Sequence, residues 1–154
     1  MGNWRGFCSI HILEADGYKL VHMSDLGTQL DGGQITRLYN ADVAMICAGS
    51  ATALPAQEAK RACDEIMAKV IIPMHYRDGG RGGHRLEMVK DFVWHFESPD
   101  FIHYYDTDTL TVTPDMEPQV AVLKYLGPEA WGALTPPERK AERGGLLAML
   151  LGKK

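Results

Sequence analysis

A chain of 154 residues with 45% hydrophobic and 23% charged residues suits one folded domain and excludes a largely disordered protein. A formal net charge of −4 and a pI of about 5.8 argue against a nucleic-acid surface. Because no stretch approaches the roughly 20 apolar residues of a membrane span and no secretory leader pattern begins the chain, we expect a cytoplasmic protein without a membrane partner. We expect the widely spaced cysteines to be reduced core residues: Cys8, Cys47 and Cys63.

Two short apolar runs near the start, 7–14 and 18–23, are joined by Asp16 and Gly17. This dipeptide between strand-like runs predicts a β-hairpin. Asp25 follows the second run, so a carboxylate lies just beyond the end of a strand. The alternative is that Asp25 stabilises a turn or caps a helix, as many aspartates after strands do.

A βαβ unit is the next prediction. After a short amphipathic helix over 32–40, residues 41–48 form a buried apolar run, 55–69 show apolar residues at helical spacing, and 70–75 form a second buried run. A strand, a helix and a second strand in this order predict two parallel strands with a right-handed crossover.

The end of that second strand is the strongest candidate for a binding site. Pro73 marks where sheet pairing stops, and His75 follows it at the edge where open α/β sheets bind ligands. A structural histidine that only forms hydrogen bonds is the alternative. The glycine-rich stretch that follows carries Arg77 and His84, which are candidates for binding an anionic substrate. A solvated surface loop is the competing interpretation.

The remaining segments complete one sheet. A helix is predicted over 86–96, and three runs are expected to form antiparallel strands: 101–105, 110–113 and 120–125. We predict one domain over 1–125 and a C-terminal tail over 126–154 that includes a helical segment at 138–151.

Three stretches, 22–27, 41–49 and 70–76, resemble at their mutual spacing the second half of a metallo-β-lactamase-fold hydrolase. They look most like the branch of ascorbate-6-phosphate lactonase-like and related metal-dependent hydrolases. The resemblance implies an α/β fold that is half of the family's αββα sandwich, with one mixed sheet and helices on one face. It also implies that Asp25 is the family's bridging metal ligand and His75 its last metal histidine.

The family's other metal-binding motif, H-x-H-x-D-H, does not occur in this sequence. A catalytic zinc requires about three protein ligands and an open position, so Asp25 and His75 are an incomplete set. We therefore expect no tightly bound metal in the chain alone, and zinc or another divalent metal if further ligands complete the site. No catalytic residue is assigned from the sequence.

Two functional hypotheses follow. In the first, the chain is a dimeric interaction or structural module without activity of its own, because the sheet face opposite the helices is apolar and a second copy could cover it and rebuild the sandwich. In the second, the chain is part of a metal-dependent hydrolase of a phosphorylated or lactone-type small molecule. The missing ligands then come from a partner chain or a separate N-terminal half.

Overall fold

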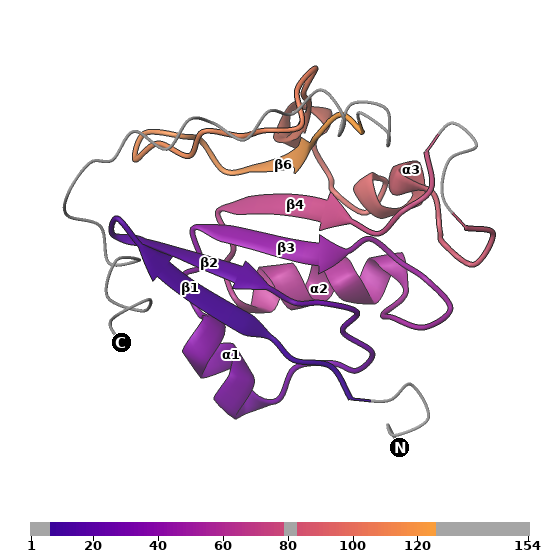
Figure 1. Cartoon of the computed structure of the whole chain (residues 1–154), viewed down its shortest axis with the longest axis horizontal. Helices are drawn as coiled ribbons and strands as arrows, with labels where there is room; N and C mark the ends of the chain where they lie inside the picture. Colours follow the sequence, from indigo (N-terminus) through magenta and orange to yellow (C-terminus); the bar gives the residue numbers. More distant parts are fainter. Residues whose placement is uncertain (1–6, 79–82, 126–154) are drawn as a thin grey trace, which may run out of the picture.

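A six-stranded mixed sheet organises the computed structural model, which describes residues 7–78 and 83–125 (Figure 1). The strand order is β1-β2-β3-β4-β6-β5, and only the β1–β2 pair is antiparallel. Within the described ranges, no helix has the length and apolar character needed to cross a membrane. The strands have these bounds: β1 His11–Ala15, β2 Tyr18–His22, β3 Val43–Cys47, β4 Val70–Met74, β5 Ile102–Tyr104 and β6 Gln119–Val122.

The predicted hairpin is confirmed. Asp16 has a φ of 52° and Gly17 a φ of 83°, which is the pair of left-handed residues that a tight two-residue turn requires. The turn fixes the register of β1 on β2, with Leu13 opposite Leu20.

The βαβ unit is confirmed as well. Strand β3, helix α2 (Ala56–Glu65) and strand β4 follow one another, and β3 pairs parallel to β4 over its whole length. The helix ends earlier than predicted because Met67 adopts a left-handed conformation with a φ of 53°. Just before it, the carbonyl of Ile66 accepts a hydrogen bond of 2.8 Å from the backbone N–H of Asn40.

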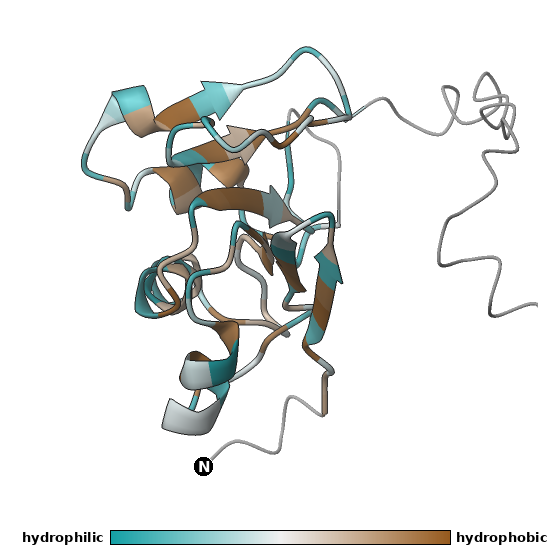
Figure 2. Cartoon of the chain, turned by 90° about the vertical axis from the view of Figure 1, so that its left-hand side faces the viewer, coloured by the Kyte–Doolittle hydropathy of each residue, from teal (hydrophilic) through white to brown (hydrophobic). Residues whose placement is uncertain are grey.

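Three helices pack on one face of the sheet, as predicted. They are α1 (Gly32–Leu38), α2 and α3 (Val89–Val93), and the latter two are close in space (Figure 1). Figure 2 shows hydrophobic residues on both the strands and the helices. The helices predicted over 32–40 and 86–96 are longer than the observed α1 and α3. The main core between helices and sheet includes Val21, Ala44, Ile46, Ala59, Ile66, Ile71, Phe92 and Val120.

The expectation of three antiparallel strands at the end of the domain is wrong. A short 3-10 helix, η2 (Pro99–Phe101), leads into β5, which pairs parallel to β6, and residues 110–113 are not a strand. A parallel pair cannot be joined by a tight turn, so the chain must cross over between β5 and β6. The predicted tail 126–154 lies outside the described residues.

The crossover covers part of the sheet face opposite the helices. Leu110, Val112 and Met116 pack against a small buried cluster that the three strands β3, β4 and β6 contribute. The face that a second copy was expected to cover is therefore already covered by the chain itself at this end of the sheet. We use the term open face for its other part, around Leu13, Leu20, Met45 and Ile72, where Leu13 is 59% exposed and the others are partly buried.

A long-range contact fixes the start of α2. Pro55, at the N-cap, makes no side-chain capping bond, and the carboxylate of Glu87 instead accepts a hydrogen bond of 3.3 Å from the backbone N–H of Ala56. That carboxylate lies directly over Gly49, which has a φ of +129°. Only glycine therefore combines this backbone conformation with the space available.

We expect Gly49→Ala to lower the free energy of unfolding by about 1–3 kcal/mol, because the new Cβ would collide with the Glu87 carboxylate and the backbone would be strained. Urea unfolding followed by circular dichroism measures this. Gly32→Ala is the matched control, since a Cβ there meets no atom within 4 Å and alanine favours the helix. Equal stability of the two variants would contradict the prediction.

Candidate metal centre

Three side chains with metal-binding atoms meet where three neighbouring parallel strands end. Asp25 follows β2, Cys47 is the last residue of β3, and His75 directly follows β4. Strand β3 pairs in parallel with both β2 and β4, so all three strands end at the same edge of the sheet. Asp25 and His75, to which the resemblance assigns metal-ligand roles, therefore lie close together at one edge of the sheet.

The contacts within this group are short. The Nδ1 atom of His75 lies 2.8 Å from Oδ1 of Asp25 and 3.8 Å from Sγ of Cys47. One ligand-type atom from each of the three residues lies within 4.8 Å of the other two. The Asp25 and His75 side chains are each about half exposed, whereas Cys47 is buried. In the part of the chain that the structure describes, this is the one group of at least three such residues.

The backbone is held in an uncommon conformation at His75 and at the residue before Asp25. Ser24, before Asp25, and His75 itself have φ values of 50° and 52°, in the left-handed region. The Ser24 N–H donates to Nδ1 of His22 at 3.2 Å, and its hydroxyl donates to the carbonyl of Ser9 at 2.7 Å. His22 therefore supports the turn before Asp25. Such backbone conformations concentrate at functional sites.

Sequence reasoning missed Cys47. It is buried, as expected, but its sulfur points to the group at the sheet edge instead of only filling the core. One sequence feature could have identified it as a site residue. Cys47 lies near the end of the predicted strand 41–48, which was expected to pair in parallel with the strand that precedes His75. Burial raises the pKa of the Cys47 thiol, and the Asp25 carboxylate adds to this rise, while hydrogen bonds from Gly49 and Ser50 oppose it. The thiol is therefore protonated near neutral pH.

Two hollows adjoin His75, and one contains a predicted substrate-binding residue. A hollow of about 300 Å³ is lined by Ser50, Thr52, His75, Gly83, His84, Arg85 and Leu86. The second, of about 370 Å³, is lined by residues including Tyr76, Leu123 and Tyr125. His84 thus lies near His75. Arg77 instead donates from Nε to the sulfur of Met88 at 3.2 Å, and Arg85, which sequence reasoning had not singled out, lines the first hollow.

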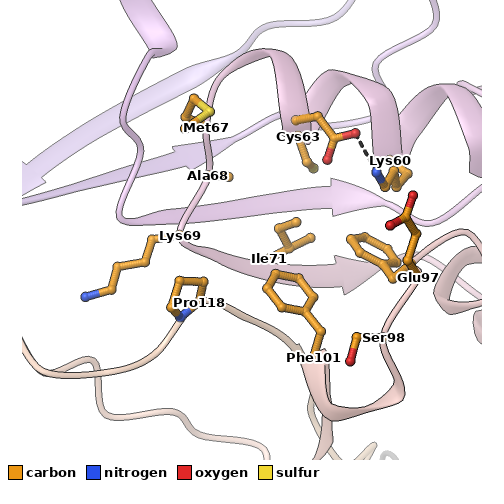
Figure 3. A pocket seen from close by; sticks show the side chains of 12 residues that line it. Lys60, Cys63, Met67, Ala68, Lys69, Ile71, Glu97, Ser98, Phe101 and Pro118 are labelled. Carbon is orange, nitrogen blue, oxygen red and sulfur yellow. Dashed lines mark hydrogen bonds and ion pairs between the residues drawn. The ribbon is translucent and has the colours of Figure 1, made fainter.

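A third hollow, of about 520 Å³, lies on the helical side of the sheet (Figure 3). Ile71, Phe101 and Pro118 contribute apolar surface to it, and a 2.6 Å ion pair joins Lys60 to Asp64. Cys63 lies among these residues, and burial raises the pKa of its thiol well above the ordinary value. No histidine lines this hollow, so it offers apolar surface and no mixed set of metal ligands.

Comparison with known proteins shows sequence similarity over the first half of the chain. A family model described as a β-lactamase superfamily domain matches residues 1–75. Curated relatives named UPF0173 metal-dependent hydrolase include one from Alkaliphilus metalliredigens (39% identical over 75 residues) and one from Methanospirillum hungatei (33% over 76 residues). Each match covers 49% of this chain, but only 31% and 35% of the respective relative. The chain therefore spans about a third of the length of these proteins.

The structural comparison extends further along the chain. A crystal structure from Thermotoga maritima, described as a candidate Zn-dependent hydrolase of the metallo-β-lactamase superfamily, superposes with a TM-score of 0.64 and 31% sequence identity. The match covers 73% of this chain and 56% of the other. The mixed sheet is thus that of a metallo-β-lactamase fold, and the N-terminal half of this chain is similar in sequence to a β-lactamase superfamily domain and to metal-dependent hydrolases.

Proposed function

We propose that this chain contributes part of the metal centre of a metal-dependent hydrolase, with Asp25 and His75 as metal ligands. The observation that carries the proposal is the 2.8 Å contact between carboxylate and imidazole at the ends of β2 and β4. The names of the curated relatives support a divalent metal. We propose that the remaining ligands come from a partner chain or a separate N-terminal half, because the H-x-H-x-D-H motif does not occur in this sequence.

The residues at this edge fit a divalent cation. A carboxylate oxygen and an imidazole nitrogen are ligands that zinc takes in catalytic sites, and both side chains are about half exposed and so within reach of an ion from solvent. When bound, such a cation polarises a carbonyl or phosphoryl oxygen and makes water more acidic.

The surrounding side chains suit a small anionic substrate. Arg85 and His84 line the hollow next to His75 together with the hydroxyl-bearing residues Ser50 and Thr52. A guanidinium group and hydroxyl groups bind phosphate or carboxylate oxygens through charge and hydrogen bonds. Tyr76 and Leu123 line the hollow on the other side of His75 and would contact the apolar part of a substrate. This arrangement favours a phosphorylated or lactone-type small molecule.

We expect the purified chain to bind added Zn²⁺ only weakly, because it supplies part of the ligand set, and His75→Ala to weaken this binding at least about tenfold, because even the loss of a residue that only supports a ligand costs about 10–100-fold. Isothermal titration calorimetry measures both affinities. His103→Ala is the matched control, since His103 lies on β5 and contacts the carbonyl of Asp100 at 3.1 Å. Equal weakening by the two substitutions would contradict the role of His75.

A dimeric interaction module is the second candidate function, and the open face favours it. Leu13 is 59% exposed there, beside the partly buried apolar side chains of Leu20, Met45 and Ile72. Apolar surface in water forgoes about 25 cal/mol per Å², so covering this face would stabilise the protein. A second copy placed face to face would complete a two-sheet sandwich with twofold symmetry.

We expect the wild-type chain to sediment as a dimer, and Leu13→Asp to shift it to the 17.1 kDa monomer, because a carboxylate would be buried in the interface. Sedimentation equilibrium at micromolar concentration tests this. Trp94→Asp is the control, because Trp94 is 85% exposed at the end of α3, on the helical side. A wild-type monomer, or a dimer that survives Leu13→Asp, would rule out this interface.

A further inference from the structure

We infer that Cys47 is a third ligand of the metal held by Asp25 and His75, so that this chain alone provides an oxygen, a nitrogen and a sulfur donor. The inference rests on the proposed function and extends it to a residue that the sequence resemblance did not assign. Its first support is position. The three residues come from the ends of three adjacent parallel strands, and Cys47 is at the end of the central one.

The distances fit one ion between the three donors. In a tetrahedral zinc shell with Zn–S near 2.3 Å and Zn–N and Zn–O near 2.0–2.2 Å, ligand atoms lie about 3.3–3.6 Å apart. The distance from His75 Nδ1 to Cys47 Sγ is 3.8 Å and that to Asp25 Oδ1 is 2.8 Å, so the observed values lie on either side of this range. The Asp25 and Cys47 ligand atoms lie within 4.8 Å of each other, so shifts of about 1 Å in the half-exposed Asp25 and His75 side chains would bring the three donors around one ion.

A nucleophilic Cys-His-Asp triad is the competing interpretation of the same residues. In a triad, one ring nitrogen of the histidine forms a hydrogen bond with the nucleophile and the other forms one with the carboxylate. Here the sulfur and the carboxylate both approach Nδ1 of His75. The thiol also donates to the backbone carbonyl of His75 at 3.7 Å. Donors that converge on one point favour a shared cation.

Binding through sulfur requires that the thiol proton leave. The Sγ–H bond of Cys47 breaks, the proton passes to the buffer, and the sulfur lone pair forms the bond to the metal. No electron is transferred and no co-reactant is needed. Because a thiolate is a soft ligand, the site should prefer Zn²⁺ or Co²⁺ to Mg²⁺ and Ca²⁺, which take oxygen ligands.

The other two cysteines offer internal controls. Cys63 is a fully buried residue of α2 and lines the hollow that has no histidine in its wall. Cys8 is exposed, before the first strand, and so accessible to an ion without belonging to the group. Cys47 is therefore the cysteine whose sulfur lies with a carboxylate and an imidazole in the described part of the chain.

Titration of the full-length chain with Co²⁺ under reducing conditions tests the inference, because thiolate coordination produces a charge-transfer band in the near ultraviolet that oxygen and nitrogen ligands do not. We expect the band in the wild-type chain, in Cys8→Ser and in Cys63→Ala, and its loss in Cys47→Ser. We also expect Cys47→Ser to bind Zn²⁺ at least about tenfold more weakly than the wild type, with an unchanged circular dichroism spectrum.

The outcomes separate the two proposals. If Co²⁺ binds in a way that depends on His75 but gives no charge-transfer band, the Cys47 inference is wrong and the metal centre of Asp25 and His75 stands. A band that persists in Cys47→Ser also overturns the inference, because another cysteine must then be the ligand. If neither Co²⁺ nor Zn²⁺ shows binding that depends on His75, the proposed function itself fails.

Discussion

Parallel pairing of β3 with both of its neighbours determines where chemistry can occur in this protein. In a parallel pair the strands run in the same direction, so the residues that follow each strand are brought to the same edge whatever their separation along the chain. Asp25 and His75 are 50 residues apart in sequence, yet their side chains are in hydrogen-bonding contact. The parallel pairing of the strands thus brings these residues to one edge of the sheet. The turns after the strands determine only the orientation of the side chains.

Small residues on the helical face keep that register fixed. Ala44 of β3 and Ala59 and Ala62 of α2 belong to the same buried core and are almost fully inaccessible to solvent. Side chains of this size allow a helix to approach a sheet closely, and a close-packed core resists small displacements. Because α2 also receives the Glu87 carboxylate at its first residue, the loop that precedes it is held between a packed helix and a distant chain segment.

The sequence was sufficient for the features that depend on local rules. The turn residues Asp16 and Gly17 predicted the hairpin, and the apolar runs on either side of α2 predicted the parallel pair. The proximity of Asp25 and His75 followed from the resemblance to a metallo-β-lactamase fold, which places the strands before them side by side. Cys47 was missed because its apolar surroundings predict a core residue, and burial alone does not tell in which direction a side chain points. Its direction depends on where β3 ends, which is uncertain by a residue or two from sequence.

Strand direction in the second part of the chain was not predictable from the same rules. The runs at 101–105 and 120–125 have the composition of strands, but composition is the same for parallel and antiparallel pairing. The path of the chain through η2 and the crossover determines that the pairing is parallel. In the crossover, Leu110 and Met116 pack against apolar residues of the sheet. That packing is a long-range interaction, which no local pattern in the sequence specifies.

The segment between Arg77 and Glu87 is closed at its base by a backbone hydrogen bond of 2.8 Å from the N–H of Arg77 to the carbonyl of Glu87. The N–H of Val89 donates in turn to the carbonyl of Arg77 at 3.2 Å. The entropy lost on closing a loop grows only with the logarithm of its length, by about 0.6 kcal/mol for each doubling. A change in the length of this loop therefore costs little closure entropy. Arg85 is held separately, because its carbonyl accepts a hydrogen bond of 3.2 Å from the N–H of Ala51, so the loop can change in length during evolution while Arg85 stays beside the hollow next to His75.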